Sequence, residues 1–272
     1  MIPLCNLHTH TTYCDGDNTV EEMIASAIEM GCKTLGFSGH SPRAHAGGWC
    51  MAEEDVKKYI EDVKSTREKY ADKIEVALGI EYDTHTVLDV SEFEYVIGSV
   101  HAIKTGDTLF DVDNGNKQKT ADIVKEFYGG DWFEYAKGYY RELCRIPDVV
   151  DCQIIGHFDL LTKVNQDYCL FDEDDPRYRR AALEALEYLC SKDYIFEINT
   201  GAISRGYRRE PYPNSFILKE MAYRGARIML NSDTHSKNTI LFHFEQAVEY
   251  ARSCGVKALT VMENKKFREI GI

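Results

Sequence analysis

Histidine and acidic side chains recur in this chain at the ends of short apolar segments, where they could bind metal ions. The segment LHTHTTYCDG (7–16) carries two histidines one residue apart, followed by an aspartate. Because side chains alternate along a strand, His8 and His10 would point to the same side. This segment alone fits either a metal site or a surface turn. The same residue types end other apolar segments, at His40, Glu81, His101, His157, Asp233 and His235.

The apolar segments that precede these residues are predicted to be buried parallel strands. They are short, nearly continuous in apolar character and rich in β-branched residues, which is typical of strands covered on both faces. They span 2–8, 34–40, 74–83, 95–101, 152–157, 194–201 and 227–235, with 258–261 as a further candidate.

Helical patterns separate these strands, at 20–30, 53–70, 120–144, 177–191, 214–223 and 238–253. Thr19 and Glu22 fit a capping box for the first helix, and Asp175 with Pro176 is a good start for the helix over 177–191. About seven strand–helix units in series predict an α/β fold, a parallel barrel with outer helices. An open doubly wound sheet has the same order of elements, but no GxGxxG motif follows the first strand to support it.

In a parallel barrel the carboxyl ends of all strands meet on one face, where active sites are built. A lone histidine such as His40 or His157 is more often a core or capping residue, Glu81 alone could be a partnered buried carboxylate, and Asp233 alone a helix cap. If all of these separate explanations held, several strand ends would each bury a polar group independently. Each unpaired group would then cost a few kcal/mol of folding free energy. A shared metal cluster accounts for all of them. His45 and His85 are predicted in loops on the solvent or substrate side, and His243 is predicted to pack at a helix start.

Composition limits the function classes. A formal net charge of −13 over 272 residues argues against a nucleic-acid-binding surface, which is usually basic. The nine cysteines are scattered without a CxxC pair, which indicates a reducing compartment and not a disulfide framework. No signal peptide is recognisable, and no apolar stretch approaches the ~20 residues needed to cross a bilayer. We therefore expect a cytoplasmic protein with no membrane contact.

With these residues assembled, the chain resembles the polymerase-and-histidinol-phosphatase (PHP) superfamily of metallo-phosphoesterases, and within it the histidinol-phosphatase branch. The motifs that carry the resemblance cover nearly the whole chain: HTHTTYCD (8–15), SGH (38–40), GIEYD (79–83), GSVH (98–101), IGHFDLLTK (155–163), EINTG (197–201) and NSDTH (231–235). The resemblance implies a distorted (β/α)7 TIM-like barrel formed by residues 1–272 as a single domain. It also implies hydrolysis of L-histidinol phosphate, a step of histidine biosynthesis.

The resemblance further implies a trinuclear centre of zinc, iron or manganese. His8, His10, Glu81 and Asp233 would hold the first ion. Glu81 would bridge to a second, held also by His101 and His157. Asp15, His40 and His235 would hold the third, and aspartate at position 15 is similar to the histidinol-phosphatase branch. Two ions bridged by a carboxylate lower the pKa of a shared water toward ~7, so the expected nucleophile is a metal-bridging hydroxide held by Glu81, without a phosphoenzyme.

Cationic residues near the strand ends are candidates for binding the substrate phosphate. Arg205 follows EINTG and is the first candidate, with Ser204 beside it and Lys163 as the second. Arg208 and Arg209 either extend the same loop or are solvated or ion-paired, and Arg43 and Lys104 have weaker claims. A loop carboxylate such as Asp111 or Asp159 could bind the ammonium or imidazole of the substrate.

Other functions remain open from the sequence. A related phosphoesterase would act on nucleotides or other small phosphate monoesters. A non-catalytic metal-binding protein would turn over no ester. A metal-dependent amidohydrolase usually bridges its ions with a modified lysine, whereas Glu81 takes that place here.

Overall fold

The structure is a computed structural model that describes residue 2, residues 4–43 and residues 47–272. His45 lies outside the described residues. The main sheet has nine strands in the order β1-β2-β3-β4-β7-β8-β9-β10-β11, and every neighbouring pair is parallel except β10 with β11. The strands are β1 (Cys5–Asn6), β2 (Thr34–Phe37), β3 (Glu75–Asp83), β4 (Tyr95–Ser99), β7 (Ile154–Ile155), β8 (Ile195–Asn199), β9 (Arg227–Asn231), β10 (Ala258–Glu263) and β11 (Lys266–Gly271).

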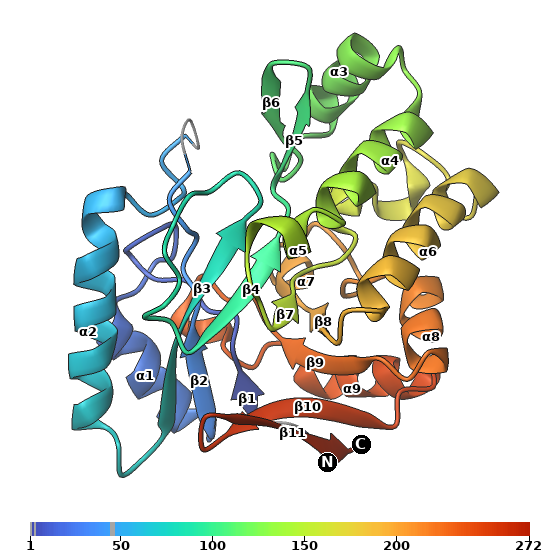
Figure 1. Ribbon diagram of the computed structural model, residues 1–272. Coiled ribbons are helices and arrows are strands. Elements are labelled where there is room, and N and C mark those ends of the chain that lie inside the picture. The colour runs from blue at the N-terminus through green and yellow to red at the C-terminus, as the bar shows by residue number, and fades with distance from the viewer. Residues whose placement is uncertain (1, 3, 44–46) are drawn as a thin grey trace.

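The sheet curls until the backbone after β1 meets the backbone after β9. Thr9 forms an isolated parallel bridge with Thr234, and the His10 amide donates to the Thr234 carbonyl over 2.9 Å. The Leu7 amide donates to Oδ1 of Asn231 over 2.8 Å. These contacts confirm a mixed α/β fold built on a curled parallel sheet (Figure 1). Closure as seven β/α units stays a prediction.

Helices flank the sheet on its outer side. In Figure 1, α1 and α2 cover the N-terminal strands, and α4, α6 and α8 stand on the opposite flank. The hairpin β5 (Ala102–Thr105) with β6 (Thr108–Asp111) projects from the upper end beside α3. The helices are α1 (Val20–Glu29), α2 (Val56–Lys69), α3 (Lys117–Tyr128), α4 (Trp132–Leu143), α5 (Ile146–Val149), α6 (Pro176–Cys190), α7 (Gly201–Ser204), α8 (Ser215–Tyr223) and α9 (Phe244–Ser253).

Local signals predicted several helix ends correctly, but two helical predictions need correction. The capping box of Thr19 and Glu22 is confirmed, and so is Asp175 as the residue that caps α6 before Pro176. The single helix predicted over 120–144 is wrong, because two helices occupy this segment. Gly129 and Gly130, with φ of 62° and 86°, end α3 in a left-handed conformation that favours glycine. The side chain of Asp131 then caps the start of α4. The helix predicted over 238–253 begins only at Phe244, after a short 3₁₀ helix at Lys237–Thr239.

Apolar side chains pack on both faces of the sheet. The larger cluster joins the sheet to the helices, and a smaller one on the other face gathers residues such as Leu7, Ala77, Ile154 and Met229 from neighbouring strands. Tyr95 belongs to this smaller cluster and reaches across it, since its hydroxyl lies 2.6 Å from the Leu7 carbonyl and 3.0 Å from that of Phe37. The side chains of this smaller cluster therefore fill one end of the space that the curled sheet encloses.

The Tyr95 ring has room only because its neighbours are glycines. A Cβ on Gly79 would lie 2.3 Å from Cζ of Tyr95. We expect Gly79→Ala to lower the free energy of unfolding by about 2–3 kcal/mol, because the ring is hydrogen-bonded and packed in place. Urea denaturation measures this change. Gly271→Ala, where the nearest atom to a new Cβ is 4.0 Å away, is the matched control. Equal effects of the two substitutions would contradict the packing argument.

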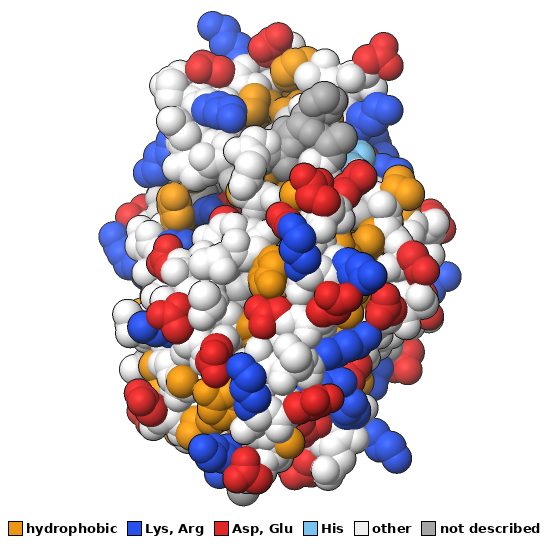
Figure 2. Space-filling model, turned by 90° about the vertical axis from the view of Figure 1, so that its left-hand side faces the viewer, with side chains coloured by type: hydrophobic (Ala, Val, Ile, Leu, Met, Phe, Trp, Pro, Cys, Tyr) orange, Lys and Arg blue, Asp and Glu red, His pale blue; other side chains and the backbone are white. Residues whose placement is uncertain are grey.

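The surface carries charges of both signs. On the face with α2, acidic and basic side chains alternate over the surface (Figure 2). Among the described residues, no helix combines the length and apolar character that a membrane span requires. The predicted cytoplasmic location is untested.

Candidate metal centre

The nine residues predicted as ligands come together at the carboxyl ends of the parallel strands. Their ligand atoms form overlapping groups, within each of which the atoms lie within 4.8 Å of one another. The groups are His10, Asp15, His40 and His235; His8, His10 and Asp233; His8, Glu81 and His157; and His40, Glu81 and His101. The strand ends therefore converge as expected, and the ligand role of each residue is taken up below as a proposal.

Glu81 lies at the centre of the cluster. It is 1% exposed, and both its carboxylate oxygens face imidazoles. Oε2 lies 2.9 Å from Nδ1 of His40 and 3.2 Å from Nε2 of His8. Oε1 lies 2.8 Å from Nε2 of His157 and 3.2 Å from Nε2 of His101. A carboxylate with this arrangement can bridge two ions.

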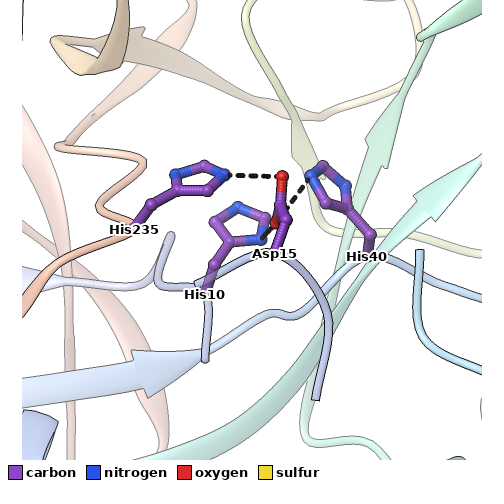
Figure 3. Close-up of side chains that lie close together, drawn as sticks. All are labelled: His10, Asp15, His40 and His235. Atoms are coloured by element: carbon purple, nitrogen blue, oxygen red, sulfur yellow. Dashed lines mark ion pairs between the residues drawn. The ribbon is translucent and has the colours of Figure 1, made fainter. Parts of the chain in front are cut away.

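Asp15 lies at the more open side of the cluster, with 32% of its side chain exposed. Figure 3 shows its carboxylate between the rings of His10, His40 and His235. Its oxygens lie 3.3 Å from Nε2 of His235 and 3.6 Å from Nε2 of His40. The turn after β1 thus brings Asp15 back over the strand ends.

Unpartnered polar atoms show that the cluster fits metal ions. Three buried atoms that face the cluster make no hydrogen bond with any described residue: His8 Nε2, His10 Nε2 and Glu81 Oε2. The Nδ1 atoms of His101 and His157, whose Nε2 atoms face Glu81, are also unpartnered. Some of them are close to a polar atom but not in hydrogen-bond geometry, as in the contact of His8 with Glu81. Leaving such atoms unpaired costs about 1–3 kcal/mol each. Imidazole nitrogens and carboxylate oxygens are the donors that zinc, iron and manganese accept.

Glu197 on β8 orients His8 from behind. It is fully buried, and its Oε1 lies 2.7 Å from Nδ1 of His8, which leaves Nε2 facing the cluster. The same carboxylate accepts from the amide of His157 over 2.9 Å and from Nδ2 of Asn199 and Asn231. A carboxylate behind a ligand histidine fixes its tautomer and strengthens it as a donor. This role of Glu197 was not predicted from the sequence.

Charges within the cluster separate the pKa values of its members. Burial lowers the pKa of His8, but Glu197, Glu81 and Asp233 outweigh burial and raise it well above its usual value. Burial and the neighbouring His235 and His40 lower the pKa of His10 to about 3, so this imidazole is neutral. Burial would raise the pKa of Glu81, but the surrounding histidines hold it well below its usual value. His10 and Glu81 therefore have the protonation states that metal binding requires, whereas His8 would have to release a proton when an ion binds.

The arrangement matches a known family. The family model described as the PHP domain matches residues 6–201. The chain belongs to the PHP domain family. The match begins before His8 and ends after Asn199, so it covers the strand ends up to β8, whereas Asp233 and His235 lie beyond it.

Relatives of this PHP protein extend over almost the whole chain. A protein of Deinococcus radiodurans, named "Probable histidinol-phosphatase", is 29% identical, with 97% of this chain and 99% of the relative covered. A protein of Schizosaccharomyces pombe with the same name is 25% identical, with 94% and 88% covered. The crystal structure of histidinol phosphate phosphatase from Lactococcus lactis, complexed with zinc, L-histidinol and phosphate, is 19% identical with a TM-score of 0.69, covering 97% of this chain and 98% of that chain. The last likeness supports the fold.

A cavity of 240 Å³ opens over the cluster of this PHP protein. Two of the predicted phosphate-binding residues, Lys163 and Arg205, line it together with Asp15, His40, Asp233 and His235. Arg205 contacts the cluster directly, since its Nη1 donates to the carbonyl of Asp233 over 2.8 Å and its Nη2 donates to Oδ2 of Asp233 over 3.0 Å. The cavity therefore combines the cluster with two cationic groups.

Other predicted substrate contacts lie elsewhere in this structure. The Ser204 hydroxyl donates to the carbonyl of Gly201 within α7 over 2.9 Å. Arg208 is buried and pairs with Glu173, and Arg209 forms an exposed pair with Asp167. Lys104 is exposed on β5.

The two carboxylates suggested for the cationic part of the substrate are also engaged. Asp111 pairs with the buried Arg43. Asp159 is buried and accepts from the amide of Asn214 over 2.8 Å. Neither lines the cavity described above. His85 lies 3.4 Å from Glu142, and His243 is the residue immediately before α9.

Four residues that line the cavity were not predicted from the sequence: Trp49, Asp113, Leu160 and Tyr207. The Trp49 ring meets those of His40 and His101 edge to face, with centroids 4.7 and 5.4 Å away. Asp113 follows the β5–β6 hairpin, which the sequence analysis did not predict. A hairpin predicted immediately after His101 would have indicated that the chain returns after β6 to the end of β4. Asp113 would then have been expected near the cluster.

Proposed function

We propose that this PHP protein is a metal-dependent histidinol-phosphatase that hydrolyses L-histidinol phosphate to L-histidinol and phosphate. One observation carries this proposal: nine potential ligand residues converge on one face, and several of their buried donor atoms have no partner among the described residues. The names of relatives that match over nearly the whole chain support the choice of substrate. The single domain, 1–272, would be a distorted (β/α)7 barrel with this face as its active site.

We propose three divalent ions, of zinc, iron or manganese. His8, His10, Glu81 and Asp233 would hold the first, Glu81, His101 and His157 the second, and Asp15, His40 and His235 the third. When bound, such ions supply Lewis-acid stabilisation of phosphoryl oxygens and a water acidic enough to give hydroxide at neutral pH. With ions bound, each carboxylate and imidazole of the cluster would face an ion. These side chains would then compensate one another's charge less than they do in this structure.

The chain's own residues would place and hold the ester. Arg205 is anchored on Asp233 with part of its guanidinium facing the cavity, so it would bind and orient a phosphoryl oxygen and offset charge that develops there. Lys163 would add a second positive charge. Glu197 would keep His8 in one tautomer through the reaction. A small phosphate monoester is the partner that this cavity admits, and nucleic acid is not expected.

A panel of phosphate esters tests the proposed function. We expect kcat/KM for L-histidinol phosphate to exceed that for AMP and for phenyl phosphate by at least about 100-fold, since polar sites reject esters that leave their groups unpaired. Steady-state phosphate release is measured with protein loaded separately with zinc, manganese or iron. Protein stripped of metal and loaded with magnesium alone is the control. A clear preference for the nucleotide would contradict the substrate assignment and favour another phosphoesterase of the family.

A further inference from the structure

Asp113 and Lys163 face each other in the wall of the cavity. They form an ion pair, with 22% of the Asp113 side chain and 9% of the Lys163 side chain exposed. The Lys163 ammonium also lies 4.6 Å from the centroid of the Tyr207 ring. The other carboxylates in the wall, Asp15 and Asp233, belong to the proposed metal cluster, so among the lining residues this ion pair is separate from it.

The loop that carries Asp113 has a fixed place over the cavity. The amide of Val112 donates to the carbonyl of His101 over 2.8 Å, which ties the end of the hairpin to the strand end. Gly115 packs so closely on Tyr207 that an added Cβ would lie 2.7 Å from the Tyr207 hydroxyl. Nδ2 of Asn114 donates to the carbonyl of Asp111 over 3.0 Å. The carboxylate is thus positioned by its loop as well as by Lys163.

Asp113 stays ionised in this setting. Burial raises the pKa of its carboxyl group, but the charges of Lys163 and His101 outweigh burial and lower the pKa to about 2. If Lys163 turned toward a phosphate, Asp113 would lose the charge that lowers its pKa and would be left partly buried without a counterion. Removing one partner of such a pair is costly unless another cation takes its place.

We propose that Asp113 is a specificity-determining residue that binds a cationic group on the alcohol part of the substrate. The ion pair with Lys163 opens when the ester enters: Lys163 contacts the phosphate, and Asp113 contacts the cation. This proposal rests on the proposed phosphatase function and names the feature of the ester that the site selects. The ammonium of histidinol phosphate has the required charge.

Selection in this scheme comes from exchange of ion pairs. A phosphate ester that also carries a cation replaces one buried pair by two, so every charge keeps a partner. An ester with an uncharged alcohol part takes Lys163 and leaves Asp113 unpaired. Discrimination then arises from the penalty on the wrong ester as well as from the contact with the right one.

Asp113→Asn separates these effects, because it removes both the contact and the penalty. The substrates are L-histidinol phosphate and 3-phenylpropyl phosphate, which has a ring and a chain of similar length but no cation. For histidinol phosphate we expect kcat/KM to fall on the order of 10- to 100-fold. For the phenylpropyl ester we expect it to rise several-fold, since the asparagine has no charge to leave unpaired. Asp107→Asn, the same change at an exposed position of the same hairpin, is the matched control and should alter neither value.

Opposite changes for the two esters support the proposal. Equal losses would overturn it, because they would mean that Asp113 only holds Lys163 in place, and the absence of any change would overturn it as well. Calorimetric binding of the two alcohols, L-histidinol and 3-phenylpropanol, to metal-loaded protein gives the same comparison without hydrolysis. Phosphoethanolamine and ethyl phosphate serve as a second cationic and uncharged pair. The ester panel with the unaltered protein tests the proposed function. The change that Asp113→Asn causes in the ratio of kcat/KM for cationic and uncharged esters tests the role of Asp113 separately.

Discussion

Replacement of Glu81 by alanine is expected to lower kcat by at least about 1,000-fold and to reduce the amount of bound metal. Preorganised charge around a reacting group commonly accounts for effects of this size. Glu81 faces His8 and His40 with one oxygen and His101 and His157 with the other, so no neighbouring carboxylate among the described residues can take its place. The variant should still fold, because it removes a buried carboxylate whose histidine partners can become neutral.

Metal analysis, steady-state kinetics and circular dichroism of the Glu81→Ala protein test this expectation. His157→Ala should behave in the same way. Glu75→Gln is the matched control, because Glu75 lies at the other end of β3, where it accepts from the amides of Asn264 and Lys265. That variant should keep its metal and its rate. If the Glu81→Ala protein retained both, the bridging assignment would be wrong.

Replacement of Arg205 by lysine is expected to lower kcat/KM on the order of 100- to 1,000-fold, although the charge is kept. The guanidinium uses two nitrogens at once to hold Asp233, with Nη1 also 2.9 Å from Nδ1 of His235. A lysine ammonium cannot reproduce this planar fork. The substitution would therefore weaken phosphate binding and loosen two proposed ligands together.

Kinetics and metal content of the Arg205→Lys protein distinguish the two roles. A rise in KM with full metal content would mean that Arg205 serves the phosphate alone, whereas loss of one ion with a fall in kcat would show that it also holds Asp233 and His235. Arg209→Lys is the control, because that side chain is 75% exposed on the same loop. A change of less than threefold in the Arg205→Lys protein would contradict both roles.

The ligand cluster was predictable because its members follow directly from strand order. Each candidate ends an apolar segment or lies just beyond one, and parallel strands bring such positions to one face whatever the details of packing. His8 and His10 show this most simply, since both lie just beyond β1 and are two residues apart. Asp15 was harder, because it depends on the turn after β1, and its assignment came from a family resemblance.

Residues that act across elements could not be predicted in this way. Glu197 supports His8 from a strand 189 residues away along the chain, so only the pairing of the strands reveals it. One local signal existed. Glu197 and Asn199 are two positions apart on β8, so their side chains lie on the same face of the strand, the face of the cluster. Arg208 has the same residue type as Arg205 but faces the buried Glu173, and nothing in their shared loop distinguishes them.

Some breaks and hairpins in the backbone were not predicted, because their turn signals were weak or were overlooked. The pair Gly129–Gly130 should have divided the helix predicted over 120–144. The hairpin of β10 and β11 turns through Asn264 and Lys265, both with positive φ. Lysine is rare in that conformation, and the usual Asn-Gly signal is absent from this turn, so β11 was not predicted.

The contacts between the segment after β1 and the segment after β9 limit the order in which folding and metal binding can occur. His8 and His10 follow a strand of only two residues, and the backbone around them is held by Asn231 and Thr234, more than two hundred positions later in the chain. Contacts of such long range form late, because the whole intervening loop must close first. The backbone around His8 and His10 can therefore take its final position only after β9 has been synthesised. We expect metal binding at these two histidines to follow the formation of β9, because their partners in the cluster are not in place before then.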